Sequence, residues 1–154
     1  NVTARFRHTD KALPQVDLGF YSQAQQAFCS EDEWAAINHD WRPELTMPVH
    51  AAWLNAILDG HSKIEEGIDV GAPVCVLLSA RSQFGLAWDE GMMYADTVLE
   101  VEGISHAALK LGASVTVDRI EGALHDVFLS DKQPRAVAYD HMDRWLRGWL
   151  AATE

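Results

Sequence analysis

The chain has 154 residues, of which 48% are hydrophobic and 23% are charged, and its formal net charge at pH 7 is −11. This composition is that of one globular domain, and it excludes long disorder, collagen and a coiled coil. An acidic chain is poorly suited to nucleic acid, because the phosphates repel it. No apolar run reaches the roughly 20 residues that a membrane-spanning helix needs, so we expect neither a membrane span nor a signal peptide.

The chain contains two cysteines, Cys29 and Cys75, which are too few for a disulfide framework. Cys75 lies inside the apolar run 73–78, so we interpret it as a small buried hydrophobic residue. Reduced thiols of this kind are typical of the cytoplasm, which is therefore the predicted location.

Residues 1–46 show little hydrophobic periodicity. Aromatic residues are scattered among prolines and acidic residues, which predicts irregular structure or short helices anchored by the aromatic side chains. A helix follows, because Pro48 suits a first helical position and Gly67 suits a stop. Between these two positions, apolar residues recur at helical spacing and form one stripe. Its members are Val49, Ala52, Trp53, Ala56, Ile57 and Ile64.

The unbroken apolar run 74–78 predicts a strand that is buried on both faces, as in a parallel sheet. A loop over 79–95 leads to a second helix at about 101–111. Residues 115–117 then alternate in polarity, which is typical of a strand near the edge of a sheet.

After a loop over 121–132, the last helix runs from about 134 to 150. Its spacing predicts an inward face and, on the solvent side, two ion pairs between residues four positions apart. The inward residues are Ala138, Met142, Trp145 and Trp149, and the pairs are Asp140 with Arg144 and Asp143 with Arg147.

Strands that alternate with helices predict an α/β fold with parallel strands joined by crossover helices. Two strands are too few for a stable parallel sheet, which is normally several strands wide and covered on both faces. The strand 74–78 is too apolar to be an edge, and residues 1–72 contain no evident neighbour for it. We therefore expect another chain, or an earlier part of a larger domain, to complete the sheet.

Polar residues follow each predicted strand at its carboxyl end, where function gathers in open parallel sheets. Asp96 follows the first strand and its loop, and His125, 29 positions later, follows the second strand. Such a pair can converge above the sheet, where the carboxylate accepts from one imidazole nitrogen and fixes the tautomer, which suits general-base catalysis. The alternatives are a turn or capping role for Asp96 and a structural role for His125.

Three segments carry a resemblance to a known family: 73–79 (Pro-Val-Cys-Val-Leu-Leu-Ser), 95–99 (Ala-Asp-Thr-Val-Leu) and 122–126 (Gly-Ala-Leu-His-Asp). Together they resemble the C-terminal half of the α/β-hydrolases. The similarity is greatest to the lysophospholipase and monoacylglycerol-lipase-like group, also called serine aminopeptidase-like. In these enzymes the catalytic residues follow the chain order Ser, acid, His.

The resemblance implies that residues 1–46 form a cap or lid and that 47–154 form the C-terminal part of a hydrolase core. It implies that Asp96 is the acid and His125 the base of a Ser-Asp-His triad. The implied substrate is a hydrophobic ester, and the implied reaction needs no cofactor and no metal.

The sequence departs from this family at the nucleophile, because it contains no Gly-x-Ser-x-Gly motif. Ser79, Ser82 and Ser130 lie near strand ends but lack the flanking glycines. We therefore expect the nucleophile half to be absent from this chain, which alone should be inactive. The long loop 79–95 leaves Asp89 as a second candidate for the acid.

Two other residue sets have competing interpretations. Trp34, Trp41 and Trp53 either line an acyl pocket beneath the cap or anchor the cap to the core. The histidines of the predicted helices 48–67 and 134–150 match no metal-binding motif, so we interpret them as residues of solvated helix faces.

A second hypothesis belongs to a different class of protein. The chain is then a non-catalytic module that associates through the exposed strand 74–78, by strand addition from a partner or a second copy. The two hypotheses are compatible, because a half-domain with an open strand is expected to form a homo-oligomer.

Overall fold

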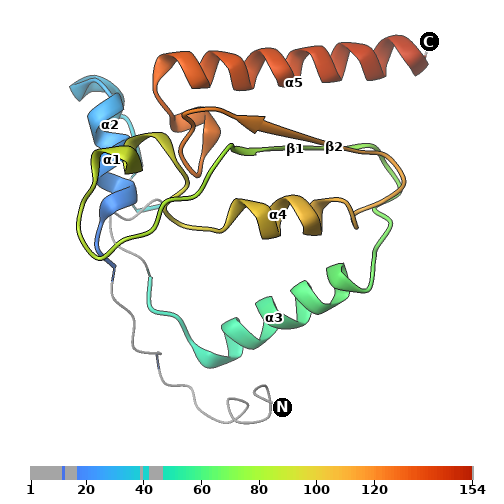
Figure 1. The fold of residues 1–154 in the computed structure, drawn as a ribbon, viewed down its shortest axis with the longest axis horizontal. Coiled ribbons are helices and arrows are strands. Elements are labelled where there is room, and N and C mark those ends of the chain that lie inside the picture. Colours follow the sequence, from blue (N-terminus) through green and yellow to red (C-terminus); the bar gives the residue numbers. More distant parts are fainter. Residues whose placement is uncertain (1–11, 13–16, 39, 42–46, 154) are drawn as a thin grey trace.

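The computed structural model describes residues 12, 17–38, 40–41 and 47–153 (Figure 1). Its elements, in chain order, are α1 (Phe20–Phe28), α2 (Glu31–Ala35), α3 (Ala51–Glu65), β1 (Val74–Ser79), the 3-10 helix η2 (Glu90–Tyr94), α4 (Val101–Ala108), β2 (Val115–Ile120), the 3-10 helix η3 (Val127–Leu129) and α5 (Lys132–Thr153). The predicted order of helix, strand, helix, strand and helix after residue 47 is confirmed. The predicted bounds differ by a few residues at the ends of α3, α4 and α5.

β1 and β2 pair in parallel, from Val74 opposite Val115 to Ser79 opposite Ile120. Among the described residues they form a two-stranded sheet, so this part of the protein has a mixed α/β fold. α4 connects the two strands and lies on one face of the sheet, while α5 lies along the other face (Figure 1). This arrangement, with a helix on each face, suits the composition of the strands: β1 is mostly apolar, and β2 is rich in β-branched residues, which pack well on a pleated surface.

The buried core lies where β2, the loop after it and the start of α5 meet. Ile120, Ala123, Val127 and Ala138 form its centre, and Leu77, Phe128 and Val137 pack against it. The loop that contains His125 therefore contributes residues on both sides of His125 to this core.

The short helix α2 is stabilised by its own sequence. Ser30 is the N-cap residue, and its Oγ accepts from the backbone N–H of Glu33 at 3.2 Å. The Glu33 carboxylate accepts in return from the N–H of Ser30 at 2.8 Å, which completes a capping box. α1 and α2 confirm the prediction of short helices in this region. The rest of the predicted cap, 1–11, 13–16, 39 and 42–46, lies outside the described residues.

The apolar stripe predicted on α3 is largely exposed. Ala51 is the buried residue of this helix, whereas Trp53 is 56% exposed and Ile57 is 37% exposed. α3 lies beyond α4 and away from the two strands (Figure 1). The described residues therefore offer no sheet face on which this stripe can pack.

Two predicted core residues are more exposed than expected. Trp149 is 44% exposed, because the 22-residue helix α5, about 33 Å long, outruns six-residue strands of about 20 Å. Cys75 is half-buried and lines a cavity, so it is not the fully buried residue that its apolar neighbours predicted. Partial burial raises the pKa of its thiol, which keeps the thiol protonated at neutral pH.

The solvent side of α5 agrees with the prediction. Arg144 lies 2.7 Å from the Asp140 carboxylate, and Arg147 lies 2.8 Å from that of Asp143. Within the described part of the chain, none of the helices has the length and apolar character needed to cross a membrane.

Candidate functional site

The site lies at the carboxyl ends of β1 and β2. Asp96 comes 17 positions after β1, yet its backbone returns to the end of that strand. The N–H of Asp96 donates to the carbonyl oxygen of Arg81 at 2.9 Å, and the N–H of Gln83 donates to that of Asp96 at 2.9 Å. An isolated parallel bridge also pairs Ser82 with Asp96, just after the end of β1. The long loop therefore delivers its acid to the edge of the sheet where the predicted site lies.

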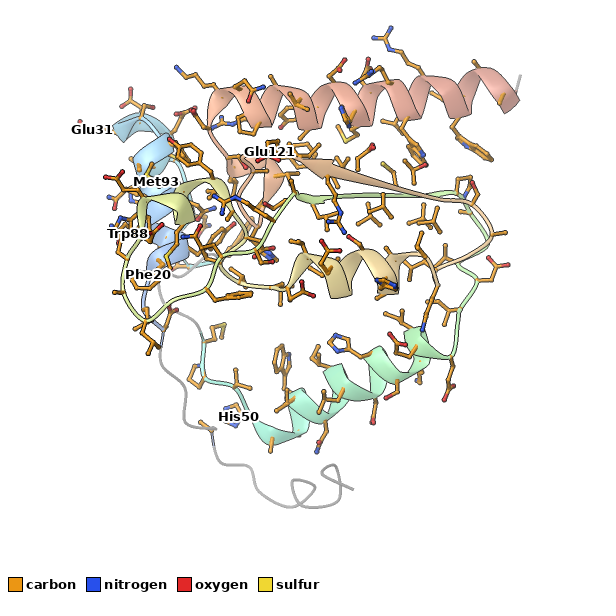
Figure 2. The ribbon with its side chains drawn as sticks, viewed as in Figure 1. Phe20, Glu31, His50, Trp88, Met93 and Glu121 are labelled. Carbon is orange, nitrogen blue, oxygen red and sulfur yellow. The ribbon has the colours of Figure 1, made fainter. Side chains whose placement is uncertain are left out.

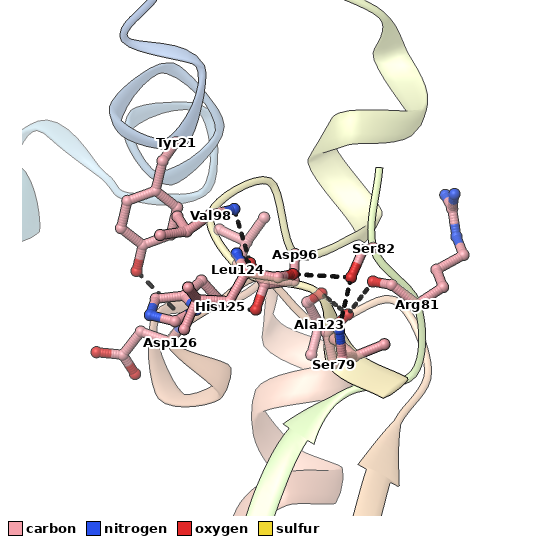
Figure 3. A network of polar contacts seen from close by, with 12 residues as sticks. Tyr21, Ser79, Arg81, Ser82, Asp96, Val98, Ala123, Leu124, His125 and Asp126 are labelled. Carbon is pink, nitrogen blue, oxygen red and sulfur yellow. Dashed lines mark hydrogen bonds and ion pairs between the residues drawn. The ribbon is translucent and has the colours of Figure 1, made fainter. Parts of the chain in front are cut away.

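The side chains of Asp96 and His125 meet above the sheet (Figure 3). Asp96 Oδ2 lies 2.8 Å from His125 Nδ1. Asp96 is 1% exposed, and its other oxygen, Oδ1, accepts from the N–H groups of Val98 at 2.7 Å and Leu99 at 2.8 Å. One carboxylate oxygen is thus fixed by the backbone, and the other is aimed at the imidazole.

Burial and hydrogen bonding act in opposite directions on Asp96. Burial raises the pKa of the carboxyl, but the hydrogen bonds from His125, Leu99 and Val98 outweigh it and hold that pKa below its usual value of 3.8. Asp96 is therefore ionised at neutral pH. Because an ionised carboxylate only accepts hydrogen bonds, His125 Nδ1 must carry the proton that they share.

The loop that carries His125 is held from two sides. Ser79, at the end of β1, donates from Oγ to the carbonyl oxygen of Ala123 at 2.7 Å. Ser130 Oγ accepts from the N–H of Leu124 at 2.8 Å. Asp126 caps η3, since its Oδ1 accepts from the N–H of Phe128 at 3.2 Å. These contacts fix the backbone on both sides of His125.

A residue of α1 completes the site. The Tyr21 ring meets the His125 ring edge-on, with centroids 5.8 Å apart and an interplanar angle of 81°. The Tyr21 hydroxyl accepts from the N–H of Asp126 at 3.3 Å (Figure 3). Sequence reasoning missed Tyr21. It lies 104 positions before His125, and no periodicity or motif in the sequence indicates that the fold brings the two residues together.

Arg135 connects α2 to the same loop. Its Nε and Nη2 donate to the carbonyl oxygen of Ser130 at 3.1 and 2.9 Å, and its Nη1 lies 3.7 Å from Glu33 Oε1. The first helices are therefore attached to the His125 loop at a second point.

A cavity of about 700 Å³ adjoins His125, between β1, η3 and α5. Its lining is mostly apolar: Tyr21, Cys75, Leu77, His125, Asp126, Val127, Phe128, Met142, Trp145 and Leu146. None of Trp34, Trp41 and Trp53 lines it, and Trp41 is 88% exposed. The acyl-pocket interpretation of these tryptophans finds no support in this cavity.

The second candidate acid, Asp89, lies elsewhere on the loop. Its Oδ1 accepts from Gln83 Nε2 at 2.6 Å and from the N–H of Gly91 at 2.8 Å, and the residue is exposed. Asp96 therefore occupies the place beside His125 Nδ1, and Asp89 has the geometry of a cap for η2.

The three serines near the strand ends are engaged with the backbone. Ser79 and Ser130 are fully buried in the contacts given above. Ser82 Oγ donates to the carbonyl oxygen of Leu99 at 2.8 Å and accepts from the N–H of Val101 at 2.9 Å. Each of these hydroxyls therefore makes a structural hydrogen bond with the main chain.

Among the residues that the structure describes, no three His, Cys, Asp or Glu side chains gather as metal ligands would. His141 Nδ1 lies 3.5 Å from Asp118 Oδ2, which makes a His–Asp contact between α5 and β2. No protein-family model, curated protein or solved structure matches the chain.

Proposed function

We propose that this chain supplies the acid and the histidine of a serine hydrolase, as the C-terminal portion of an α/β-hydrolase fold. The observation that carries the proposal is the 2.8 Å contact between the buried, ionised Asp96 and His125 Nδ1. The contact lies at the carboxyl ends of two parallel strands, where acid and base are held on separate loops. The resemblance to the lysophospholipase and monoacylglycerol-lipase-like group supports the proposal, because it implies the same two residues as the acid and the histidine.

In this mechanism His125 acts through Nε2, because Nδ1–H is directed at Asp96. His125 takes the proton of a serine hydroxyl as the oxygen attacks an ester carbonyl, and it then delivers the proton to the leaving alkoxide. Asp96 holds the imidazole in the required tautomer and stabilises the imidazolium that forms. The two hydrogen bonds from Val98 and Leu99 keep the carboxylate oriented for that role.

In this proposal the nucleophile comes from outside this sequence, either from an earlier segment of the same polypeptide or from a separate chain. No serine of the chain lies in a Gly-x-Ser-x-Gly elbow, which presents the hydroxyl on a strained turn. The hydroxyls of Ser79, Ser82 and Ser130 are bonded to main-chain groups. By itself the chain is therefore expected to be inactive.

A hydrophobic ester is the substrate class that we propose. The cavity beside His125 is lined mainly by apolar side chains, including Leu77, Phe128 and Met142. An acyl chain in such a lining gains roughly 0.8 kcal/mol per buried CH₂ group. In the longer protein that carries the nucleophile, kcat/KM for 4-nitrophenyl esters should rise with acyl length, and a preference for the acetate ester would contradict this substrate class.

A fluorophosphonate probe tests the proposed function. The isolated chain should remain unlabelled, whereas the product of the reading frame extended upstream of Asn1 should be labelled on a Gly-x-Ser-x-Gly serine. In that longer protein His125→Gln should abolish ester hydrolysis. The matched control, His141→Gln, removes another His–Asp contact and should leave hydrolysis intact. Stoichiometric labelling of the isolated chain, or hydrolysis that survives His125→Gln, would overturn the proposal.

A second candidate function is association through the open edge of β1. The N–H groups of Val74 and Ala80 point toward β2, where they donate to the carbonyl oxygens of Ser114 and Ile120. Because parallel strands alternate their hydrogen-bonding direction, the N–H groups of Cys75 and Leu77 face the opposite edge. No strand of the described residues pairs with that edge, and β1 carries no charged residue that would oppose pairing with a second copy.

Light scattering after size exclusion tests this association. A homodimer that dissociates when Cys75→Pro or Leu77→Pro is introduced would support pairing at this edge, since proline cannot donate to a ladder. Because the chain carries a net charge of −11, added salt should strengthen the dimer. A monomer at all concentrations would exclude this second function and leave the first one standing.

A further inference from the structure

The helix α1 touches both loops of the site. On the acid side, Phe20 contacts Trp88 (Figure 2), and Phe28 contacts Tyr94. In each pair the ring centroids are 5.9 Å apart. Trp88 and Tyr94 belong to the loop that leads to Asp96. On the histidine side, Tyr21 contacts His125 and Asp126. Because α1 contacts both loops, it helps to fix the position of the Asp96 loop relative to the His125 loop.

The Tyr21 hydroxyl acts on the peptide group that follows His125. The N–H that it accepts, that of Asp126, belongs to the peptide bond joining His125 to Asp126. Fixing this peptide plane fixes the backbone dihedral angle ψ of His125, on which the direction of the side chain depends. The Tyr21 ring meets the imidazole edge-on, with centroids 5.8 Å apart, and so restricts the movement of the imidazole toward α1.

The Tyr21 hydroxyl is itself held in place. Gln25, one helical turn further along α1, donates from Nε2 to this hydroxyl at 3.0 Å. Gln25 is 3% exposed and its neighbour Ala24 is fully buried, so this side of α1 is packed against the protein. The buried amide of Gln25 thus holds the Tyr21 hydroxyl in the position from which it accepts the Asp126 N–H.

We infer that Tyr21 is a positioning residue for His125, which it holds in line with Asp96 through the Asp126 peptide and through ring contact. The role of the pair in hydrolysis rests on the proposed function. The positioning itself concerns the geometry of Asp96 and His125, and it can be measured in the isolated chain.

The test follows the Nδ1–H proton of His125 by NMR in the chain labelled with ¹⁵N-histidine. In Tyr21→Phe, which keeps the ring and removes the hydroxyl, solvent exchange of this proton should be about 3- to 10-fold faster, as the loss of one hydrogen bond allows. Gln25→Met keeps the buried volume and removes the amide donor, so it should accelerate exchange by a smaller factor. Tyr94→Phe is the matched control, because Tyr94 contacts Phe28 on the acid side, and it should leave exchange unchanged.

Wild-type exchange rates and ¹⁵N shifts in Tyr21→Phe, with the amide spectrum of the loop intact, would overturn the inference. Equal acceleration in Tyr94→Phe would also overturn it, because the effect would then not pass through Asp126. The longer hydrolase supplies a separate readout: Tyr21→Phe should lower kcat and leave KM unchanged. Failure of fluorophosphonate labelling in that protein would count against the hydrolase function, and the NMR result would still decide the role of Tyr21.

Discussion

Ser79 and Ala123 are 44 residues apart in the chain, and the Oγ of Ser79 donates to the carbonyl oxygen of Ala123 at 2.7 Å. Both residues are 0% exposed. The bond joins the end of β1, where the acid loop begins, to the loop that carries His125 (Figure 3). It therefore fixes the relative position of the two segments on which the site depends.

Ser79→Ala should reduce the free energy of unfolding by about 1–3 kcal/mol, because it leaves the buried carbonyl of Ala123 without this donor. Urea unfolding followed by circular dichroism measures the loss. Ser62→Ala is the control, since the Ser62 hydroxyl donates to the Leu58 carbonyl on the exposed helix α3. Its effect should stay within about 0.5 kcal/mol. Equal effects of the two substitutions would contradict the importance of the Ser79 bond.

Gly122 begins the loop after β2 with a φ of +72°. A Cβ at this position would find no atom closer than 3.8 Å, so a substitution meets backbone strain but no clash. Gly122→Ala should cost about 1–2 kcal/mol, and Gly122→Asn should cost less, because Asn visits the left-handed region more readily. Thermal unfolding of the two variants measures this order.

Gly60 provides the opposite case. It lies inside α3, and a Cβ there meets nothing within 4 Å. Gly60→Ala should stabilise the protein by up to about 1 kcal/mol, because Ala is the better helix former. If Gly60→Ala and Gly122→Ala changed the free energy of unfolding in the same direction, the positive φ of Gly122 would not be what disfavours alanine there.

The sequence predicted the features that depend on local patterns. The run 74–78 is continuously apolar, and it forms β1, covered on both faces by α4 and α5. The polar positions Asp140 and Asp143 pair with arginines four residues later, as helical spacing requires. Asp96 and His125 were predicted to converge because parallel strands bring their carboxyl ends to one edge of the sheet.

Features that depend on distant partners could not be predicted. The apolar stripe of α3 has the spacing of a buried face, but burial needs an opposing surface, and Trp53 and Ile57 remain exposed. The contact of Tyr21 with Asp126 joins segments whose separation follows only from the packing of α1 against the loops. The choice between Asp89 and Asp96 as the partner of His125 also depended on tertiary structure. Both are aspartates of the same long loop, and the local sequence does not show which of them lies beside His125.

Acid should weaken the protein through Asp96. The pKa of Asp96 is lower in the folded protein than the 3.8 of the free side chain, so the ionised form stabilises the fold. This contribution is fully present above about pH 5, and it is lost as pH falls below about 4 and through the folded pKa. Unfolding measured between pH 2 and pH 7 should show this loss in the wild type, and Asp96→Asn should lack it.

At pH 7 Asp96→Asn should cost about 1.5–3 kcal/mol, the range for hydrogen bonds to a buried charged group. Asp89→Asn removes an exposed carboxylate of the same loop, where a capping contribution of at most about 1 kcal/mol is expected. If wild type and Asp96→Asn lost stability in parallel below pH 4, Asp96 would not be the source of the acid sensitivity.

Asp96→Asn should also reverse the tautomer of His125. The N–H groups of Val98 and Leu99 both require an acceptor, so the carbonyl oxygen of Asn must take the place of Asp96 Oδ1. The amide NH₂ then occupies the place of Oδ2, 2.8 Å from His125 Nδ1, and donates to it. His125 would therefore carry its proton on Nε2, where it can no longer accept the proton of a nucleophile. The ¹⁵N shifts of the imidazole should exchange their pattern between wild type and variant, and kcat of the longer hydrolase should fall about 10⁴-fold. Unchanged ¹⁵N shifts in a folded Asp96→Asn variant would show that Asp96 does not select the tautomer.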